Sequence, residues 1–416
     1  MRRFAGKTRL GRSLGAGLAA GALLGALAGP ALAQPDLGPG PDRAPATSAA
    51  EAWTSEDLAA LRAALREAPA HGLDASALAR ALRTAGPDDP GRLSAVALTY
   101  ARALAFGVVD PKRIHQSFSL ETNRGDLAGE LQATLSQHRL GEWLQSLAPQ
   151  DATYRALSRA YLQTRAAVRA HPAGPALRAR ARTLALNLER LRWLDRTPPA
   201  TRIDVNVAAA RLWFLMDGAV LDSRKVVAGA PGHETPLLQA SFRRIVVNPP
   251  WIVPHDIAAK EILPKGRRYL ARHDMRIVDG RVIQEPGPES SLGAVKFDLQ
   301  DDADIYLHDT PQQSAFERAD RHLSHGCVRV EDAVGFARLV AEQFGAADQL
   351  DDRLASGETA SVSLDADVPV RLLYLTAYVD DGGVHFARDA YGWDADLAQA
   401  LDLGEDALAI PVKPGP

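Results

Sequence analysis

The 416-residue chain contains one cysteine, Cys327. A single thiol excludes an internal disulfide framework, which an exported protein in need of covalent bridges would build from an even number of cysteines. The formal net charge is only −3, so the composition gives no reason to expect nucleic acid as a partner. Beyond the first thirty-odd residues no segment is apolar enough to span a membrane. The lone cysteine is either an inert core residue or a reactive group, and the residues around it in the sequence distinguish these two possibilities.

The N-terminus has the pattern of a secretory signal peptide. A basic start precedes an uncharged run from Ser13 to Gly29, and Ala31-Leu32-Ala33 forms a small-x-small cleavage site. The run is shorter than the roughly 20 residues of a membrane-spanning helix, which favours cleavage over anchoring. We expect residues 1–33 to be a signal peptide and residues 34–50 a flexible leader rich in Pro, Gly and Ala.

Residues 51–197 are predicted to form an all-α domain. Apolar residues recur at helical spacing in six segments, which are 55–65, 75–82, 93–106, 127–135, 154–168 and 176–193. No cluster of catalytic residue types occurs there, so we expect this half to serve as a scaffold.

A change of pattern at Pro198-Pro199 marks a second domain, predicted over residues 198–395. Short alternating segments follow, and Asp217-Gly218 has the signature of a type I′ hairpin, with a second Asp-Gly at 279–280. One helix is expected at 331–344, a solvated loop at 348–353, and a C-terminal tail at 396–416. The predicted fold class is α+β, with a mostly β sandwich or barrel after the helices.

The segment 248–293 is too long and irregular for a simple connection between strands. It is rich in proline, yet Trp251, Ile252, Ile262 and Leu263 argue against disorder. Long insertions in compact domains are usually functional or disordered. We therefore interpret it as a capping insertion over an active site.

Cys327 lies in the run Ser324-His325-Gly326-Cys327-Val328-Arg329. A cysteine must become a thiolate to attack a carbonyl, and three histidines could accept its proton: His308, His322 and His325. A helix beginning near residue 331 and the charge of Arg329 would also favour the thiolate. Gly326 leaves room for a substrate, and the N–H groups of Gly326 and Cys327 could hold an oxyanion.

A metal site is the first alternative, because three histidines and one cysteine are also zinc ligands. His322 and His325 are three residues apart, which could share a helical face. Ser324, Gly326 and the strand context instead favour a loop. A loop does not hold His322 and His325 on one face, so we favour Cys327 as a nucleophile over a zinc site. No metal or organic cofactor is expected.

The Ser324–Arg329 run, with His308 nineteen residues before Cys327, resembles the signature of the L,D-transpeptidases with a YkuD-type catalytic domain. Further segments over most of 185–395 resemble the large, scaffolded Gram-negative branch, the YcbB type. They are Pro236, Asn248-Pro249-Pro250-Trp251, Ile262-Leu263-Pro264-Lys265, Ser291-Leu292-Gly293, Lys296-Phe297 and Tyr306–Pro311. The small peptidoglycan-binding module often inserted in the helical region of that branch has no clear counterpart here.

The resemblance implies a role for each matching residue. Cys327 would be the nucleophile, His308 its base, and His325 and Gly326 would shape the site. Asp309 or Thr310 would complete the triad, through a side chain or a backbone carbonyl. Expected substrate contacts are Arg329, Ser324, Tyr306 and Trp251.

The resemblance also implies a reaction in the periplasm. The donor would be a peptidoglycan stem tetrapeptide, held as a thioester, and a second stem's amine would complete a 3→3 cross-link. Carbapenem-type inhibitors would acylate the same cysteine. Water as acceptor would make the protein an L,D-carboxypeptidase, and an envelope protein's amine would make it a protein-to-wall attachment enzyme. A non-catalytic wall-binding scaffold is the alternative of another class.

Overall fold

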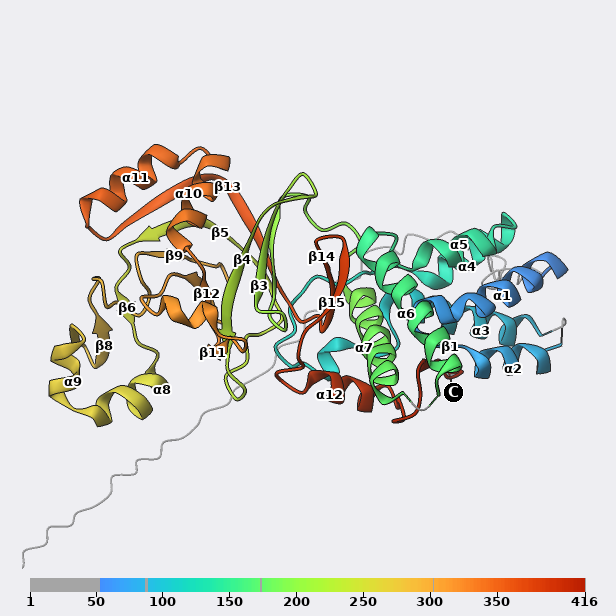
Figure 1. Ribbon diagram of the computed structural model, residues 1–416. Coiled ribbons are helices and arrows are strands. Elements are labelled where there is room, and N and C mark those ends of the chain that lie inside the picture. The colour runs from blue at the N-terminus through green and yellow to red at the C-terminus, as the bar shows by residue number, and fades with distance from the viewer. Residues whose placement is uncertain (1–52, 87–88, 173, 302, 416) are drawn as a thin grey trace, which may run out of the picture. The chain divides into compact units, whose positions relative to one another are not determined.

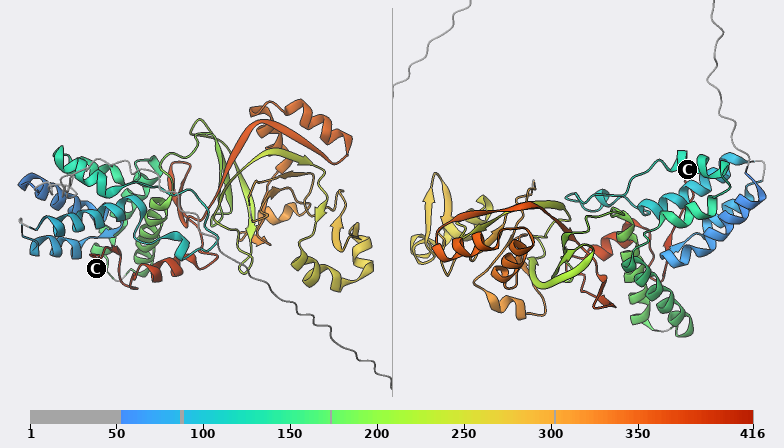
Figure 2. Two further views of the ribbon diagram at one scale, coloured as in Figure 1. Left: turned by 180° about the vertical axis from the view of Figure 1, so that it is seen from behind. Right: turned by 90° about the horizontal axis from the view of Figure 1, so that it is seen from above.

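The computed structural model describes residues 53–86, 89–172, 174–301 and 303–415. The predicted signal peptide and leader lie outside these residues. Figures 1 and 2 show a helical region, a region built around a β-sheet with several long strands, and a small separate group of helices and strands.

Helices build the described N-terminal half, as predicted, and the first begins with a capping box between Thr54 and Asp57. Their bounds are α1 (Ser55–Glu67), α2 (Ser76–Thr84), α3 (Pro90–Phe106), α4 (Leu127–Ser136), α5 (Leu140–Leu147), α6 (Ala152–Ala170) and α7 (Pro175–Trp193), with short 3₁₀ turns η1 (Ala68–His71) and η2 (Pro111–Arg113). The sequence did not predict α5, which is only two turns long and buries just Leu140 and Leu144.

A nine-stranded sheet forms the centre of the second half, in the order β11-β4-β12-β10-β9-β5-β13-β2-β3. Its strands are β2 (Arg202–Asn206), β3 (Arg211–Met216), β4 (Ala219–Gly229), β5 (Gln239–Val247), β9 (Val295–Phe297), β10 (Leu307–His308), β11 (His322–Ser324), β12 (Val328–Val330) and β13 (Ala360–Leu373). An additional pairing of β3 with β4 closes the sheet on itself. The expectation of a mostly β domain after the helices is confirmed.

Asp-Gly pairs make the turns that the sequence predicted. Asp217 and Gly218 both have positive φ (50° and 83°), as do Asp279 and Gly280 (49° and 76°), which is the backbone of a type I′ turn. A third pair, at 381–382, joins β14 (Ala377–Asp380) to β15 (Gly383–Phe386). The sequence pattern predicts strands at 362–379 and 383–386, which agrees with this turn but misses the break at 374–376 between β13 and β14.

Two helices follow β12, where the sequence predicted one. α10 (Ala333–Gln343) matches the prediction and packs Phe336 between Phe214 and Phe297 of the sheet. α11 (Ala347–Ser356) replaces the expected solvated loop at 348–353, so that prediction was wrong. Leu350 is fully buried, and the surrounding charges hid this single apolar anchor.

The insertion forms a small cap with its own core. A three-stranded sheet, β6-β8-β7, combines with short helical turns around buried Val253, Ile262 and Val282. The elements are β6 (Trp251–Ile252), α8 (His255–Ile257), a π turn η3 (Ala258–Ile262), η4 (Leu263–Lys265), α9 (Arg267–Arg272), β7 (Met275–Val278) and β8 (Arg281–Gln284). Figure 1 shows α8, α9, β6 and β8 grouped together.

The predicted C-terminal tail is instead an ordered return to the helical region. α12 (Trp393–Ala400) is followed by β16 (Ile410–Pro411), which pairs in parallel with β1 (Leu73–Asp74). Ile410 is fully buried there, which explains why the segment is held in place. Among the helices of the described ranges, none combines the length and the apolar character needed to cross a bilayer.

Candidate active site

Cys327 lies at the start of β12, next to the parallel strand β10. His308 of β10 pairs with Arg329 of β12, and the N–H of Val328 donates to the carbonyl of Tyr306 at 3.1 Å. Leu307 and Val328 are fully buried in the core. Because side chains alternate along strands, the residues on either side of them face the other way. This places the side chains of Tyr306, His308, Cys327 and Arg329 on one face of two neighbouring strands.

His308 has the tautomer of a general base. Its Nδ1 lies 2.6 Å from the carbonyl oxygen of Asp309, which can only accept, so Nδ1 carries the proton and Nε2 has the free lone pair. Burial, followed by the charge of Arg329, lowers the pKa of His308 to about 3. The imidazole is therefore neutral near pH 7 and able to take a proton.

The thiol of Cys327 is held in its protonated form. Burial raises the pKa of Cys327, while hydrogen bonds from the backbone and the hydroxyl of Tyr306 act in the opposite direction. Sγ also lies 3.9 Å from the carbonyl oxygen of Asp304. With the pKa of His308 lowered as well, the resting pair is a neutral thiol and a neutral imidazole. The thiolate must therefore form during the reaction, by transfer of the thiol proton to a base, because burial outweighs the nearby donors at rest.

The predicted help from a helix N-terminus is also absent. β12 carries the chain about 10 Å away from Cys327, at roughly 3.3 Å per residue, before α10 begins at Ala333. A helix dipole acts within about its first turn. The N-terminus of α10 is therefore too far from the sulfur to favour a thiolate.

Two cations flank His308 on the strand face. Lys296 of β9 pairs with His308 on one side and Arg329 on the other. Lys296 lies over the ring of Tyr306, 4.2 Å from its centre, and bonds Asp298 at 2.8 Å. Sequence reasoning gave Lys296 no role. Its position between buried Val295 and Phe297 was the available signal, because alternation forces it onto the site face.

Arg329 has spare donors. One Nη donates to Gln312 Oε1 at 3.0 Å, and its buried Nε has no hydrogen-bond partner among the described residues. An unsatisfied buried donor of a guanidinium is suited to receive a carboxylate. The predicted substrate contact at Arg329 stays a prediction, now with this observation behind it.

Ser324 shapes the loop that holds the cysteine. Its buried hydroxyl donates to the carbonyl of Cys327 at 2.6 Å and accepts from the N–H of Gly326 at 3.2 Å. Gly326 has φ +114°, a conformation that L side chains rarely adopt. Ser324 contacts the loop itself in this structure, and a direct substrate contact from it stays a prediction.

Asp309 and Thr310 are the candidates for the third triad position. Neither side chain bonds His308, which instead contacts a backbone carbonyl. The carbonyl of Asp309 orients His308, while its carboxylate accepts from the N–H of Ala294 at 2.8 Å. The hydroxyl of buried Thr310 accepts from the N–H of Gln312 at 3.3 Å. The backbone carbonyl of Asp309 is thus the group that accepts from His308 Nδ1, and its role as third member of a triad stays a prediction.

The cap reaches the site through two residues. His325 Nε2 lies 2.7 Å from Glu261 Oε1 of η3, and its ring packs on His233 at 4.7 Å. Trp251 of β6 lies near the hydroxyl of Tyr306, which in turn lies near Cys327. His325 is part of the link between cap and loop, and sequence reasoning missed Glu261 because its partner lies 64 residues away.

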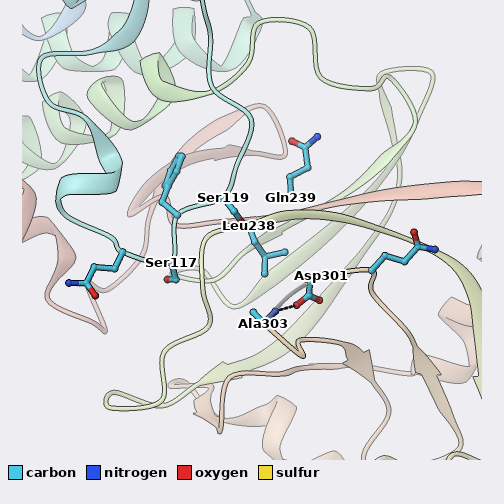
Figure 3. A pocket seen from close by; sticks show the side chains of 9 residues that line it. Ser117, Ser119, Leu238, Gln239, Asp301 and Ala303 are labelled. Atoms are coloured by element: carbon cyan, nitrogen blue, oxygen red, sulfur yellow. Dashed lines mark hydrogen bonds between the residues drawn. The ribbon is translucent and has the colours of Figure 1, made fainter. Parts of the chain in front are cut away.

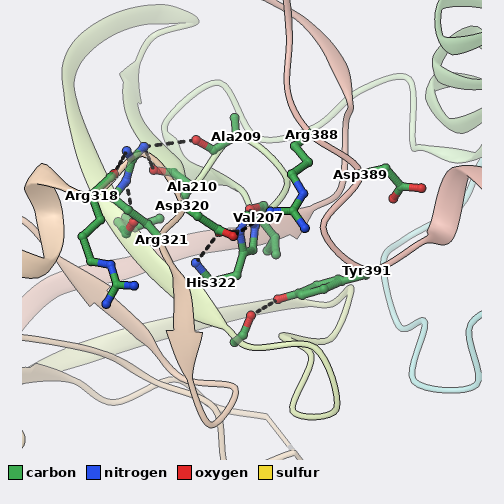
Figure 4. Close-up of polar contacts among 12 residues, drawn as sticks. Val207, Ala209, Ala210, Arg318, Asp320, Arg321, His322, Arg388, Asp389 and Tyr391 are labelled. Atoms are coloured by element: carbon green, nitrogen blue, oxygen red, sulfur yellow. Dashed lines mark hydrogen bonds and ion pairs between the residues drawn. The ribbon is translucent and has the colours of Figure 1, made fainter. Parts of the chain in front are cut away.

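His322 is held by other contacts, at a distance from the strand face. Nδ1 lies 2.8 Å from Asp320 and Nε2 3.0 Å from the carbonyl of Val207, as Figure 4 shows. Both ring nitrogens thus face oxygen acceptors, which leaves neither free for a metal. Within the described residues no three His, Cys, Asp or Glu side chains are grouped so that they could hold a metal ion.

A separate hollow of about 640 Å³ lies beside the 300–303 segment and the segment that precedes α4 (Figure 3). Its lining is largely polar and consists of Gln116, Ser117, Phe118, Ser119, Leu238, Gln239, Gln300, Asp301 and Ala303. None of the predicted site residues lines it.

Comparison with known proteins assigns both halves. Residues 200–353 match the family model of the L,D-transpeptidase catalytic domain (YkuD), and residues 46–160 match that of a scaffold domain. A Haemophilus influenzae protein named "Putative L,D-transpeptidase" is 32% identical over 239 residues, which are 51% of this chain and 48% of that protein. The chain thus spans about half the length of this curated relative.

The solved structures that match this chain are more distant in sequence. The catalytic domain of the Enterococcus faecium L,D-transpeptidase acylated by ertapenem aligns at 15% identity and a TM-score of 0.24, covering 42% of this chain and 99% of that one. An L,D-transpeptidase from Mycobacterium smegmatis aligns at 14% identity and a TM-score of 0.24, covering 42% and 58%. Together, the two family models establish that this chain carries an L,D-transpeptidase catalytic domain of the YkuD family, preceded by a scaffold domain.

Proposed function

We propose that this protein is a periplasmic L,D-transpeptidase that forms 3→3 cross-links in peptidoglycan through an acyl-enzyme on Cys327. The observation that carries the proposal is the shared strand face of His308 and Cys327, with Nε2 of His308 unprotonated. No hydrogen bond joins the two side chains in this structure, and catalytic hydrogen bonds often tighten only when substrate is bound.

The first half-reaction follows from the resting protonation states. Sγ attacks the carbonyl carbon of the third residue of a donor tetrapeptide while Nε2 of His308 takes the thiol proton. The carbonyl electron pair moves to oxygen and then returns. The bond to the terminal D-alanine breaks, and His308 gives the proton to the departing amine. Arg329 would bind a carboxylate of the stem peptide, and its unpartnered buried Nε supports this role.

In the second half-reaction the side-chain amine of another stem attacks the thioester. His308 takes a proton from this amine, the carbon–sulfur bond breaks, and the thiol of Cys327 is restored. Exclusion of water from the thioester would favour the amine as acceptor. The cap would provide this exclusion, because its residue Trp251 lies near Tyr306, which is close to the sulfur of Cys327.

Muropeptide analysis tests the proposal. The protein and its Cys327→Ala variant are each expressed in a strain without other L,D-transpeptidases, and the digested wall is separated and identified by mass. We expect 3→3 dimers that depend on Cys327. Tripeptides without dimers would assign an L,D-carboxypeptidase instead, and no Cys327-dependent change would contradict acyl transfer on the wall.

A further inference from the structure

A small network of hydrogen bonds lies next to the loop that carries Cys327. Three of its bonds close a ring through Gly229, Thr235 and Tyr391. A fourth bond joins Thr235 to Gly326, which lies 91 residues away in the sequence. Thr235, which lies between β4 and β5 and is fully buried, connects this ring to Gly326. None of the sequence-predicted roles involves Thr235 or Tyr391.

The direction of each bond in this network is fixed by its chemistry. The N–H of Gly229 donates to Thr235 Oγ1 at 2.9 Å, so the single hydroxyl proton of Thr235 is left to donate to the carbonyl of Gly326 at 2.7 Å. The Tyr391 hydroxyl donates to the carbonyl of Gly229 at 2.7 Å and accepts from the N–H of Thr235 at 3.3 Å. Figure 4 shows Tyr391 with its hydroxyl bonded.

The bond to Gly326 orients the peptide group that contains the N–H of Cys327. In a planar trans peptide the C=O of one residue and the N–H of the next point in opposite directions. Since the carbonyl of Gly326 is directed at Thr235, the N–H of Cys327 is directed away from it. The glycine conformation at φ +114° permits this orientation.

The N–H of Cys327 is also an available donor. The N–H of Gly326 is already bonded to Ser324, whereas that of Cys327 donates to no group in the described part of the chain. A donor fixed before reaction is what stabilises a developing oxyanion, because no reorganisation is needed at that moment.

We propose that Thr235, supported by Tyr391, is a positioning residue that aims the N–H of Cys327 at the oxyanion of the tetrahedral intermediate. The inference rests on the proposed acyl-enzyme function. It assigns the preorganisation of the site to a buried hydroxyl that touches neither substrate nor sulfur.

Two reactions of the same sulfur separate this role from a merely structural one. Acylation by imipenem passes through an oxyanion, because sulfur attacks the β-lactam carbonyl, the carbon–nitrogen bond breaks and the nitrogen takes up a proton. Alkylation by iodoacetamide displaces iodide at a saturated carbon and forms no oxyanion. The full chain is reacted with each reagent, intact mass gives the rates, and thermal unfolding checks the fold.

Thr235→Val should lower the maximal acylation rate by roughly 10- to 100-fold, the upper figure being near the loss of an oxyanion-hole donor. Half-saturating imipenem and the alkylation rate should stay within about twofold. Thr235→Ser keeps the hydroxyl and should restore acylation, and Tyr391→Phe should give a smaller decrease of the same kind. If the valine variant does not fold, the comparison of Tyr391→Phe with Thr235→Ser tests the inference instead. Acylation should then be slower in Tyr391→Phe than in Thr235→Ser, with equal alkylation rates.

Wild-type acylation rates in folded Thr235→Val would overturn the inference, as would an equal loss of alkylation. Failure of wild-type Cys327 to acylate at all would overturn the proposed function and this inference with it. The two failures are distinguishable because one is seen only in the variants and the other in the wild type.

Discussion

The scaffold and the catalytic face both contain buried charge, but they balance it differently. In α7 the fully buried Glu189 bonds Arg192 at 2.6 Å, and Arg192 also donates to the carbonyl of His71 and the hydroxyl of Tyr154. On the catalytic face Lys296 and Arg329 flank a neutral His308. Arg329 forms no ion pair with any described residue. A structural network thus pairs its charges, whereas a site leaves one free for the substrate.

The largest expected effect on chemistry comes from removing the base. His308→Gln leaves no group basic enough to take the thiol proton, so acylation by imipenem at pH 7 should fall by about 10²- to 10⁴-fold. The loss should shrink at high pH, where the thiol of Cys327 ionises without help. Acylation rates from pH 6 to 10 measure this, and a profile parallel to the wild type would contradict the role of His308.

The scaffold network should affect stability and leave the chemistry unchanged. Glu189→Gln leaves Arg192 buried without its charge partner, and breaking such a pair costs about 3–5 kcal/mol. Denaturant unfolding should show this decrease in the free energy of unfolding. The acylation rate of the folded fraction should equal that of the wild type, and a matching loss in rate would remove the distinction between the regions. Exposed Glu142→Gln, which breaks a surface pair with Arg139, is the matched control.

The sequence predicted the chemistry better than its arrangement. Ser324–Arg329 and His308 led directly to the domain that the family model confirms. What the sequence could not show were contacts between distant segments, such as Glu261 with His325 or Thr235 with Gly326. It also could not show burial, which raises the pKa of Cys327.

Local rules also failed where tertiary packing decided the outcome. The Asp-Gly turns were predictable because two residues determine their geometry. α11 was not, because one buried leucine among charges gives a weak periodic signal. The C-terminal segment was mistaken for a tail since its pairing partner, β1, lies over 330 residues earlier.

Removing the unpaired cation should move the acid limit of the reaction. After burial, Arg329 is the next cause that lowers the pKa of His308. Arg329→Met should therefore raise that pKa, and a return to the ordinary 6.5 would leave about a tenth of the imidazole neutral at pH 5.5. The ratio of maximal acylation rates at pH 5.5 and 7.5 should fall by up to about tenfold. An unchanged ratio would argue against coupling between the two residues.

Stability should fall with acidity in both regions. Burial, followed by neighbouring arginines, lowers the pKa of His71 and His115 to about 4 and that of His308 to about 3. These folded-state values lie below the unfolded value of 6.5, so the unfolded chain binds protons first. The stabilisation is complete above pH 6.5 and is lost as the pH drops toward 3. Tm from pH 7.5 to 4 should fall less steeply in His71→Gln than in the wild type, and identical slopes would contradict this.

The smallest effect is expected at the link between cap and loop. Glu261 and His325 are partly exposed, and such pairs contribute about 0–1 kcal/mol. Glu261→Gln should change acylation by imipenem by less than about fivefold, and Glu289→Gln on the cap serves as a comparison. A loss as large as that of His308→Gln would mean that His325, held by Glu261, takes part in proton transfer.

The central claim is that Cys327 forms the acyl-enzyme, and intact mass after incubation with imipenem tests it most directly. The wild type should gain one acyl mass, located on Cys327 by peptide mapping, and Cys327→Ala should gain none. Labelling of another residue, or an unmodified wild type with an alkylatable thiol, would contradict the account.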